Sequence, residues 1–184
     1  MSVEVKDRMT ADEFLPWAEA QEGRRELQDG ALVSISPERL LHTETKGQVY
    51  SVLRAALARA GAPREFLPSG AAVRINENKV FDLDALVYRR PRLAPDAIEV
   101  PEPVIVVEIL SPATAARDHG VKFTGYFSLR SLVHYLILDP DRRVLIHHRR
   151  GQGDVIETRI LTDGVVRLDP PGVEASVETL FAER

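Results

Sequence analysis

The strongest constraint on the fold is a run of branched apolar residues closed by prolines, PVIVVEILSP at 103–112. A run of this kind, in which polar and apolar residues do not alternate, is typical of a strand buried on both faces of a sheet. Its single carboxylate, Glu108, loses hydration in such a strand unless a cation or hydrogen-bond donors replace the water. The run therefore predicts a central strand that carries a functional site.

A second strand is predicted at 80–87, VFDLDALV, where acidic and apolar residues alternate. Alternation with a period of two places Asp82 and Asp84 on one face and the apolar residues on the other. If this strand pairs with the strand of Glu108, then Asp84 and Glu108 can share one divalent cation, which prefers hard oxygen ligands. The two runs together predict a metal site between neighbouring strands.

Asp84, Glu108 and Lys122, taken in this order, resemble the PD-(D/E)XK nuclease superfamily, and specifically its Uma-type branch of restriction endonucleases. The resemblance covers most of the chain. Its further marks are Glu26-Leu27-Gln28-Asp29-Gly30, His42 at the start of a helix, Val107 through Pro112, Asp118 with Tyr126, and Tyr135 through Asp139-Pro140.

Two positions depart from the superfamily pattern. Leu83 stands where a proline would precede the aspartate, and Leu110 stands where a lysine would follow the glutamate. The resemblance implies that Lys122, on the following helix, takes the place of that lysine in this branch. His134 and Leu136 stand where the branch has a glutamate and a tryptophan, which changes the packing there and not the acids.

Length and composition favour one globular domain over residues 1–184, because 44% hydrophobic residues suffice for a core. The net charge of −4 argues against a protein that coats nucleic acid through a broadly basic surface, although a local basic cleft stays possible. The absence of cysteine excludes disulfides, thiolate zinc sites and a cysteine nucleophile. No signal peptide or membrane-spanning run is evident, so we expect a cytoplasmic protein.

The predicted order of elements in the centre of the chain is helix, strand, strand, strand, helix, strand, with further hairpins at both ends. One of these hairpins is expected at Asp29-Gly30, which suits a type I′ turn. The order predicts an α+β fold with a mixed central sheet flanked by helices. This arrangement is similar to the restriction-endonuclease-like core.

The resemblance implies a metal-dependent endonuclease that hydrolyses DNA phosphodiester bonds. It implies that Asp84, Glu108 and the carbonyl of Ile109 hold Mg²⁺ or Mn²⁺, with Glu26 as an additional ligand. It also implies that Lys122 orients or deprotonates the attacking water. These four side chains, Asp84, Glu108, Lys122 and Glu26, are the predicted catalytic residues, and one or two metal ions remain possible.

Several of these residues have a simpler interpretation when the resemblance is set aside. Spacing alone makes Glu26 a solvated hairpin residue, and an isolated lysine such as Lys122 is usually solvated on a helix. His42 at a helix entrance is more often a cap or a surface residue than a contact for substrate phosphate. His147 and His148 alternate in direction, so they are expected at the surface and not as a chelating pair.

Three further residues are candidates for binding substrate. Arg89 and Arg90 are either solvated or hold a phosphate backbone. Tyr126 lies one helical turn from Lys122, so both side chains can face the carboxylates.

An alternative function belongs to another class: a catalytically inactive module on the same fold that binds nucleic acid or dimerises. Dependence of an activity on metal would separate this alternative from the enzyme. A homodimer is expected for either function, because the hairpins leave exposed strand edges and many DNA targets are twofold symmetric.

Overall fold

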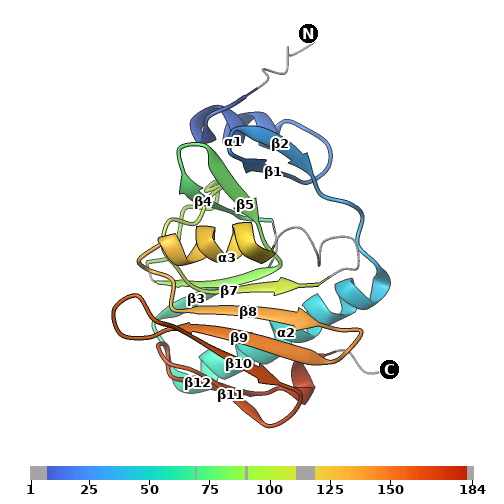
Figure 1. Cartoon of the computed structure of the whole chain (residues 1–184), viewed down its shortest axis with the longest axis vertical. Helices are drawn as coiled ribbons and strands as arrows, with labels where there is room; N and C mark the ends of the chain where they lie inside the picture. The colour runs from blue at the N-terminus through green and yellow to red at the C-terminus, as the bar shows by residue number, and fades with distance from the viewer. Residues whose placement is uncertain (1–7, 69, 90, 111–118, 182–184) are drawn as a thin grey trace.

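The structure is a computed structural model that describes residues 8–68, 70–89, 91–110 and 119–181 (Figure 1). Its elements in chain order are α1 (Ala11–Glu19), β1 (Arg25–Gln28), β2 (Ala31–Ser34), α2 (Leu40–Ala60), β3 (Arg64–Pro68), β4 (Ala72–Asn76), β5 (Lys79–Asp82), β6 (Ala85–Arg89), β7 (Pro103–Ile109), α3 (His119–Ser128), β8 (His134–Asp139), β9 (Val144–Arg150), β10 (Ile156–Leu161), β11 (Val165–Leu168), β12 (Val173–Ser176) and the 3₁₀ turn η1 (Glu178–Leu180).

The central sheet has six strands in the order β10-β9-β8-β7-β6-β3. β7 and β8 run parallel, whereas the other neighbours run antiparallel, so the sheet is mixed as the sequence predicted. β7 lies inside the sheet, and all its residues except Glu108 are buried. The prediction of a central strand at 103–110 is therefore confirmed.

Helices cover both faces of this sheet (Figure 1). On one face, Val49 and Leu53 of α2 pack with Ile105 and Val107 in a core that also includes β12 and η1. On the other face, Tyr126 of α3 packs with Val106 and with side chains of β8. Because side chains alternate along β7, Glu108 shares the face of Val106 and points toward α3.

A second sheet has four strands in the order β2-β1-β5-β4, with α1 packed beside it. The chain passes from this sheet into the six-stranded sheet at Leu83-Asp84, between β5 and β6. The prediction of one continuous strand over 80–87 is therefore wrong: β5 pairs with β1 and β4, whereas β6 pairs with β3 and β7. Asp84 consequently lies at the entrance to β6.

Residues with positive φ mark the turns that glycine and asparagine-like residues favour. Asp29 and Gly30 both have positive φ, 50° and 84°, as a type I′ hairpin requires. α2 ends at Gly61, which is left-handed with φ 58°. Asp118, one of the marks of the family resemblance, lies outside the described residues. No helix in the described ranges is long and apolar enough to span a bilayer.

Candidate functional site

Asp84 is fixed between the two central strands by hydrogen bonds at its backbone and side chain. Its N–H donates to the Val107 carbonyl at 3.3 Å, and its Oδ2 accepts from the Ile109 N–H at 2.7 Å. Its Oδ1 lies 3.2 Å from His42 Nε2 and 3.0 Å from Lys46 Nζ. The carboxylate is buried, so these partners replace the water it has lost.

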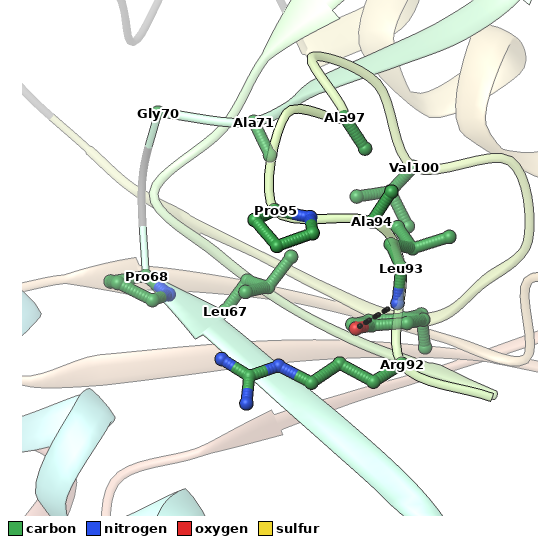
Figure 2. A pocket seen from close by; sticks show the side chains of 11 residues that line it. Leu67, Pro68, Gly70, Ala71, Arg92, Leu93, Ala94, Pro95, Ala97 and Val100 are labelled. Carbon is green, nitrogen blue, oxygen red and sulfur yellow. Dashed lines mark hydrogen bonds between the residues drawn. The ribbon is translucent and has the colours of Figure 1, made fainter. Parts of the chain in front are cut away.

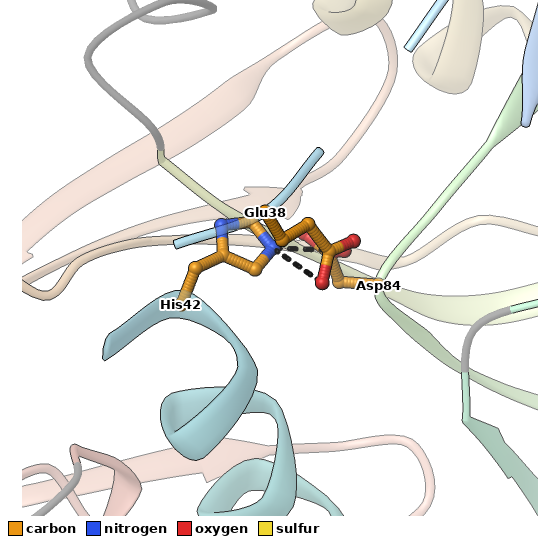
Figure 3. A group of neighbouring side chains, drawn as sticks. All are labelled: Glu38, His42 and Asp84. Atoms are coloured by element: carbon orange, nitrogen blue, oxygen red, sulfur yellow. Dashed lines mark hydrogen bonds and ion pairs between the residues drawn. The ribbon is translucent and has the colours of Figure 1, made fainter. Parts of the chain in front are cut away.

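Asp84 and three side chains near its Oδ1 form a group that we call the Lys46 cluster. Its members are Glu38, His42, Lys46 and Asp84. Lys46 Nζ lies 2.7 Å from Glu38 Oε1, and His42 Nε2 lies 3.8 Å from Glu38 Oε2. Arg24 also pairs with Glu38. Figure 3 shows the His42 ring directed at both carboxylates, and one ligand atom from each of Glu38, His42 and Asp84 lies within 4.8 Å of the others.

A second group, the Lys122 cluster, consists of Glu26, Glu108, Lys122 and Tyr126. Lys122 Nζ lies 2.8 Å from Glu26 Oε1 and 2.9 Å from Glu108 Oε1, and it also donates to the Asp82 carbonyl at 3.3 Å. The Tyr126 hydroxyl donates to Glu108 Oε1 at 2.7 Å. The cluster joins β1, β7 and α3, which are far apart in sequence, around one ammonium group.

The two clusters meet between Asp84 and Glu108, and their environments shift the two carboxyl groups in opposite directions. Burial alone would raise the pKa of Asp84, but the hydrogen bond from His42, the charges of His42 and Lys46 and the Ile109 N–H lower it to about 2. Burial raises the pKa of Glu108 to about 7 despite the charge of Lys122, and the negative charges of Asp84 and Glu26 add to the increase. Neighbouring acids with divergent pKa values are typical of functional sites.

The same contacts keep Lys122 protonated. Burial opposes its charge, but the carboxylates of Glu108 and Glu26 outweigh burial and raise the pKa of the ammonium group. Burial and the charge of Glu108 likewise raise the pKa of Tyr126 well above its usual value, which leaves its hydroxyl a hydrogen-bond donor.

α3 packs closely against β5 of the four-stranded sheet while Lys122 and Tyr126 contact Glu108 of β7. A Cβ atom on Gly125 would lie 2.7 Å from Cε2 of Phe81, a ring with no exposed surface. Only a residue without a Cβ fits there, because real Cβ atoms do not make such contacts. Gly125 therefore sets the height of α3 above the sheet.

The structure buries three predicted residues that sequence spacing alone would place in solvent or on the surface. Glu26 is 3% exposed, His42 7% and Lys122 9%, and each of them contacts an acid or a base of the two clusters. Tyr126 has no exposed surface. Asp82, the other acid of the run at 80–87, accepts a hydrogen bond from Arg24 Nε at 2.6 Å.

The predicted phosphate contacts lie elsewhere. Arg89 is exposed at the end of β6 opposite Asp84, roughly 17 Å along the strand, and Arg90 is outside the described residues. Ile109 does lie beside Asp84, through its N–H.

Sequence reasoning missed Glu38 and Lys46. Both belong to a pattern that was available, because Glu38, His42 and Lys46 follow one another at intervals of four residues. Side chains with this spacing lie on one face of a helix. His42 and Lys46 lie on one face of α2 and Glu38 just precedes the helix, so three titratable groups at this spacing are the signal that would have found them.

A separate pocket of about 300 Å³ lies near the 92–100 loop (Figure 2). Its lining is largely apolar, with Arg92 as the charged member, and it includes no residue of either cluster. The Tyr88 hydroxyl accepts from the Leu93 N–H at 3.3 Å at its base. The pocket therefore forms no part of the candidate site.

The chain is similar in sequence to a known family and to a known protein. Residues 11–181 match a family model described as "Uma2: Putative restriction endonuclease". The chain is 23% identical over 176 residues to "Uncharacterized protein slr1290" of Synechocystis sp., across 95% of this chain and 92% of that protein.

The fold also matches a crystal structure described as a putative nuclease belonging to DUF820 from Anabaena variabilis. The TM-score is 0.73 at 19% sequence identity, over 94% of this chain and 97% of that one. At this level of identity, the match establishes a shared fold.

Proposed function

Since the chain belongs to the Uma2 family of restriction-endonuclease-like proteins, we propose that it is a metal-dependent endonuclease that hydrolyses DNA phosphodiester bonds. The observation that carries the proposal is the convergence of three charged groups: Asp84, which is buried and hydrogen-bonded to β7, Glu108 of β7, and the buried Lys122 ammonium group 2.9 Å from Glu108. Burying three charged groups together is costly, so it indicates chemistry rather than a stabilising ion pair.

The donor set fits a divalent metal in either of two ways, and Asp84 belongs to both. One set is the predicted one, Asp84, Glu108, the Ile109 carbonyl and Glu26, which offers oxygen ligands suited to Mg²⁺ or Mn²⁺. The other is Glu38, His42 and Asp84, whose ligand atoms already lie together. A bound metal would lower the pKa of a water molecule and neutralise charge on the scissile phosphate.

The remaining side chains have separate tasks in this proposal. Lys122 is protonated, which favours orienting the attacking water and stabilising negative charge over deprotonating the water. Tyr126 is fully buried, so it positions Glu108 rather than touching substrate. His42 positions Asp84 through its Nε2 contact.

The proposal is tested by incubating plasmid and oligonucleotide DNA with the protein in Mg²⁺, Mn²⁺ or chelator. We expect cleavage with metal, none with chelator, and loss of activity in Asp84→Asn and Glu108→Gln. Asp96→Asn, a change at an exposed loop residue, is the matched control and should cleave normally. Cleavage that survives chelator, or that Asp84→Asn leaves intact, would refute the metal-dependent mechanism.

One observation supports the alternative of an inactive nucleic-acid-binding or dimerising module. Lys46 and Lys122 already pair with the carboxylates of both clusters, so these carboxylates are neutralised without an ion. A protein that binds DNA equally well with and without metal and never cleaves it would favour this alternative. In either case we propose a single domain over residues 1–184, a cytoplasmic location and a homodimer.

A further inference from the structure

β10 is an exposed edge of the six-stranded sheet. Within the described part of the chain it pairs with β9 alone, and β11 and β12 form a sheet of their own. The other edges are shorter or blocked: β3 ends in Pro68, and Ala72 of β4 bonds the 98–100 segment. An unprotected edge of this length is a template for pairing with another strand.

Apolar side chains also collect at this edge. Ile160 is 70% exposed and Val155 is 57% exposed, and they are among the large hydrophobic residues that the structure leaves in solvent. Their neighbours on β10, Glu157 and Arg159, are exposed and carry opposite charges. The edge therefore offers both apolar surface and charge to a partner.

The backbone groups at the edge can be assigned from the hairpin that joins β9 to β10. The Gly151 N–H donates to the Val155 carbonyl at 2.8 Å, which makes Gly151 and Val155 a hydrogen-bonded pair. In an antiparallel ladder such pairs alternate, so the backbone groups of Ile156, Thr158 and Ile160 point away from β9 toward the open edge.

We propose that a second copy of this chain pairs with β10 along this edge, antiparallel, with Thr158 opposite Thr158 of the second copy. This register sets Glu157 opposite Arg159, Ile156 opposite Ile160 and Val155 opposite Leu161, each twice by symmetry. Opposite charges and apolar pairs across strands stabilise a sheet.

Two neighbouring registers also bring the backbone groups of Ile156, Thr158 and Ile160 to the interface, and both are unfavourable. Moving one strand by two residues in one direction places Glu157 opposite Glu157. Moving it by two residues in the other direction places Arg159 opposite Arg159. Like charges directly opposite one another destabilise a pair of strands. Of these three registers, only the one with Thr158 opposite Thr158 makes the sequence of β10 complementary to itself.

The inference supplies the surface for the proposed homodimer, and it is independent of metal binding and of cleavage. The twofold axis would be perpendicular to the sheet, midway between the two β10 strands. With strands ~4.8 Å apart, the Lys122 clusters of the two copies would be separated by about 35 Å. If the protein acts on DNA, this separation is close to one turn of the duplex.

The first test uses reversed charges and sedimentation equilibrium without metal or DNA. Glu157→Arg and Arg159→Glu each place like charges opposite one another and should raise the dimer dissociation constant about tenfold or more. The double variant E157R/R159E restores opposite pairs and should restore the dimer. A monomeric wild-type protein, or a double variant that dimerises no better than the single variants, would overturn the proposal.

The second test exploits the absence of cysteine in the chain. Thr158→Cys introduces one thiol at the twofold axis, where paired residues in an antiparallel sheet lie about 5.5 Å apart between Cα atoms, a separation that suits a disulfide. Mild oxidation should cross-link this variant into covalent dimers. Ser51→Cys on the exposed side of α2 is the control and should stay uncross-linked. Equal cross-linking of the two variants would place the interface elsewhere, even if the protein proved to be a nuclease.

Discussion

At the scale of single residues, the candidate site is organised by two ammonium groups set among four carboxylates. Lys46 bridges Glu38 and Asp84, and Lys122 bridges Glu26 and Glu108. Each lysine occupies the position between oxygen atoms that a divalent cation would also favour. Replacing each lysine is therefore expected to have a different effect on DNA cleavage and on metal affinity, and the two effects can be measured separately.

Replacing Lys122 by methionine tests its part in the reaction. Lys122→Met keeps the aliphatic stem, and we expect cleavage to fall by roughly two to four orders of magnitude because a charge-stabilising group is lost. Metal binding should persist, since lysine is not a ligand. DNA cleavage and Mn²⁺ titration on the same preparation check both statements. Near-normal cleavage would leave Lys122 a structural residue that holds Glu26 and Glu108 together.

Replacing Lys46 by methionine tests which carboxylates hold the metal. If the metal is bound by Glu38, His42 and Asp84, then Lys46→Met removes a competing cation, and the Mn²⁺ dissociation constant should fall by about tenfold. Isothermal titration calorimetry measures the change, with Lys79→Met, remote from both clusters, as the matched control. If instead Lys122→Met tightens Mn²⁺ and Lys46→Met does not, the ligands are Glu26 and Glu108.

At the scale of elements, the sequence predicts those whose signals are local. The strand within the apolar run at 103–112 and the Asp29-Gly30 turn are of this kind, and both are confirmed. β3 was missed, because REFLP carries no alternation of β-branched residues and is a strand only through its pairing with β6. The break at Leu83-Asp84 was also missed, since only the contacts of two separate sheets reveal it.

The candidate site shows the same division between local and distant causes. Local strand patterns pointed to Asp84 and Glu108, and the resemblance pointed to Lys122, whereas the burial of Glu26 and His42 comes from elements far away in sequence. Alternation correctly directed His147 and His148 to opposite faces, but the expectation that both lie at the surface is wrong for His147. It is 2% exposed, because β9 is an interior strand that places it against His134 of β8.

The close approach of α3 to the sheet leads to a prediction about Gly125. Gly125→Ala places a methyl group against the buried Phe81 ring, and overpacking of this kind costs about 1–3 kcal/mol, partly offset by the better helix propensity of alanine. Lifting α3 should also move Lys122 and Tyr126 from Glu108 and lower cleavage. Gly120→Ala, on the same helix with nothing within 4 Å of its Cβ, is the control. In chemical denaturation, the Gly120→Ala variant should be as stable as the wild-type protein or slightly more stable. Equal stability of the Gly125→Ala and Gly120→Ala variants would contradict this account.

At the scale of the whole molecule, stability should depend on pH through a buried pair of histidines remote from the candidate site. His134 Nδ1 lies 2.9 Å from His147 Nε2, between β8 and β9. Burial, with the charge of Arg149, lowers the pKa of His134 to about 4. Burial and the charges of His134, Arg159, Arg149 and His148 lower the pKa of His147 to about 3. Both histidines are therefore neutral in the folded protein at pH 7.

In the unfolded chain these histidines take up protons near pH 6.5, whereas in the folded protein they do so only near pH 4 and below. Between these values the unfolded state binds more protons, so the free energy of unfolding falls as the pH falls. From pH 7 to pH 5 the loss should be about 2 kcal/mol for each of the two histidines.

Glu108 acts in the opposite direction over the same interval, because its pKa is raised in the folded protein and its contribution to stability is lost as the pH rises toward 7. The two effects are separated by comparing wild-type protein with the double variant H134L/H147L, which keeps Glu108 and removes the histidines. Urea denaturation at pH 5, 6 and 7 should show the wild-type protein losing more stability than the variant as the pH is lowered. If the two proteins follow parallel pH dependences, the histidine pair is already protonated, or solvated, in the folded state.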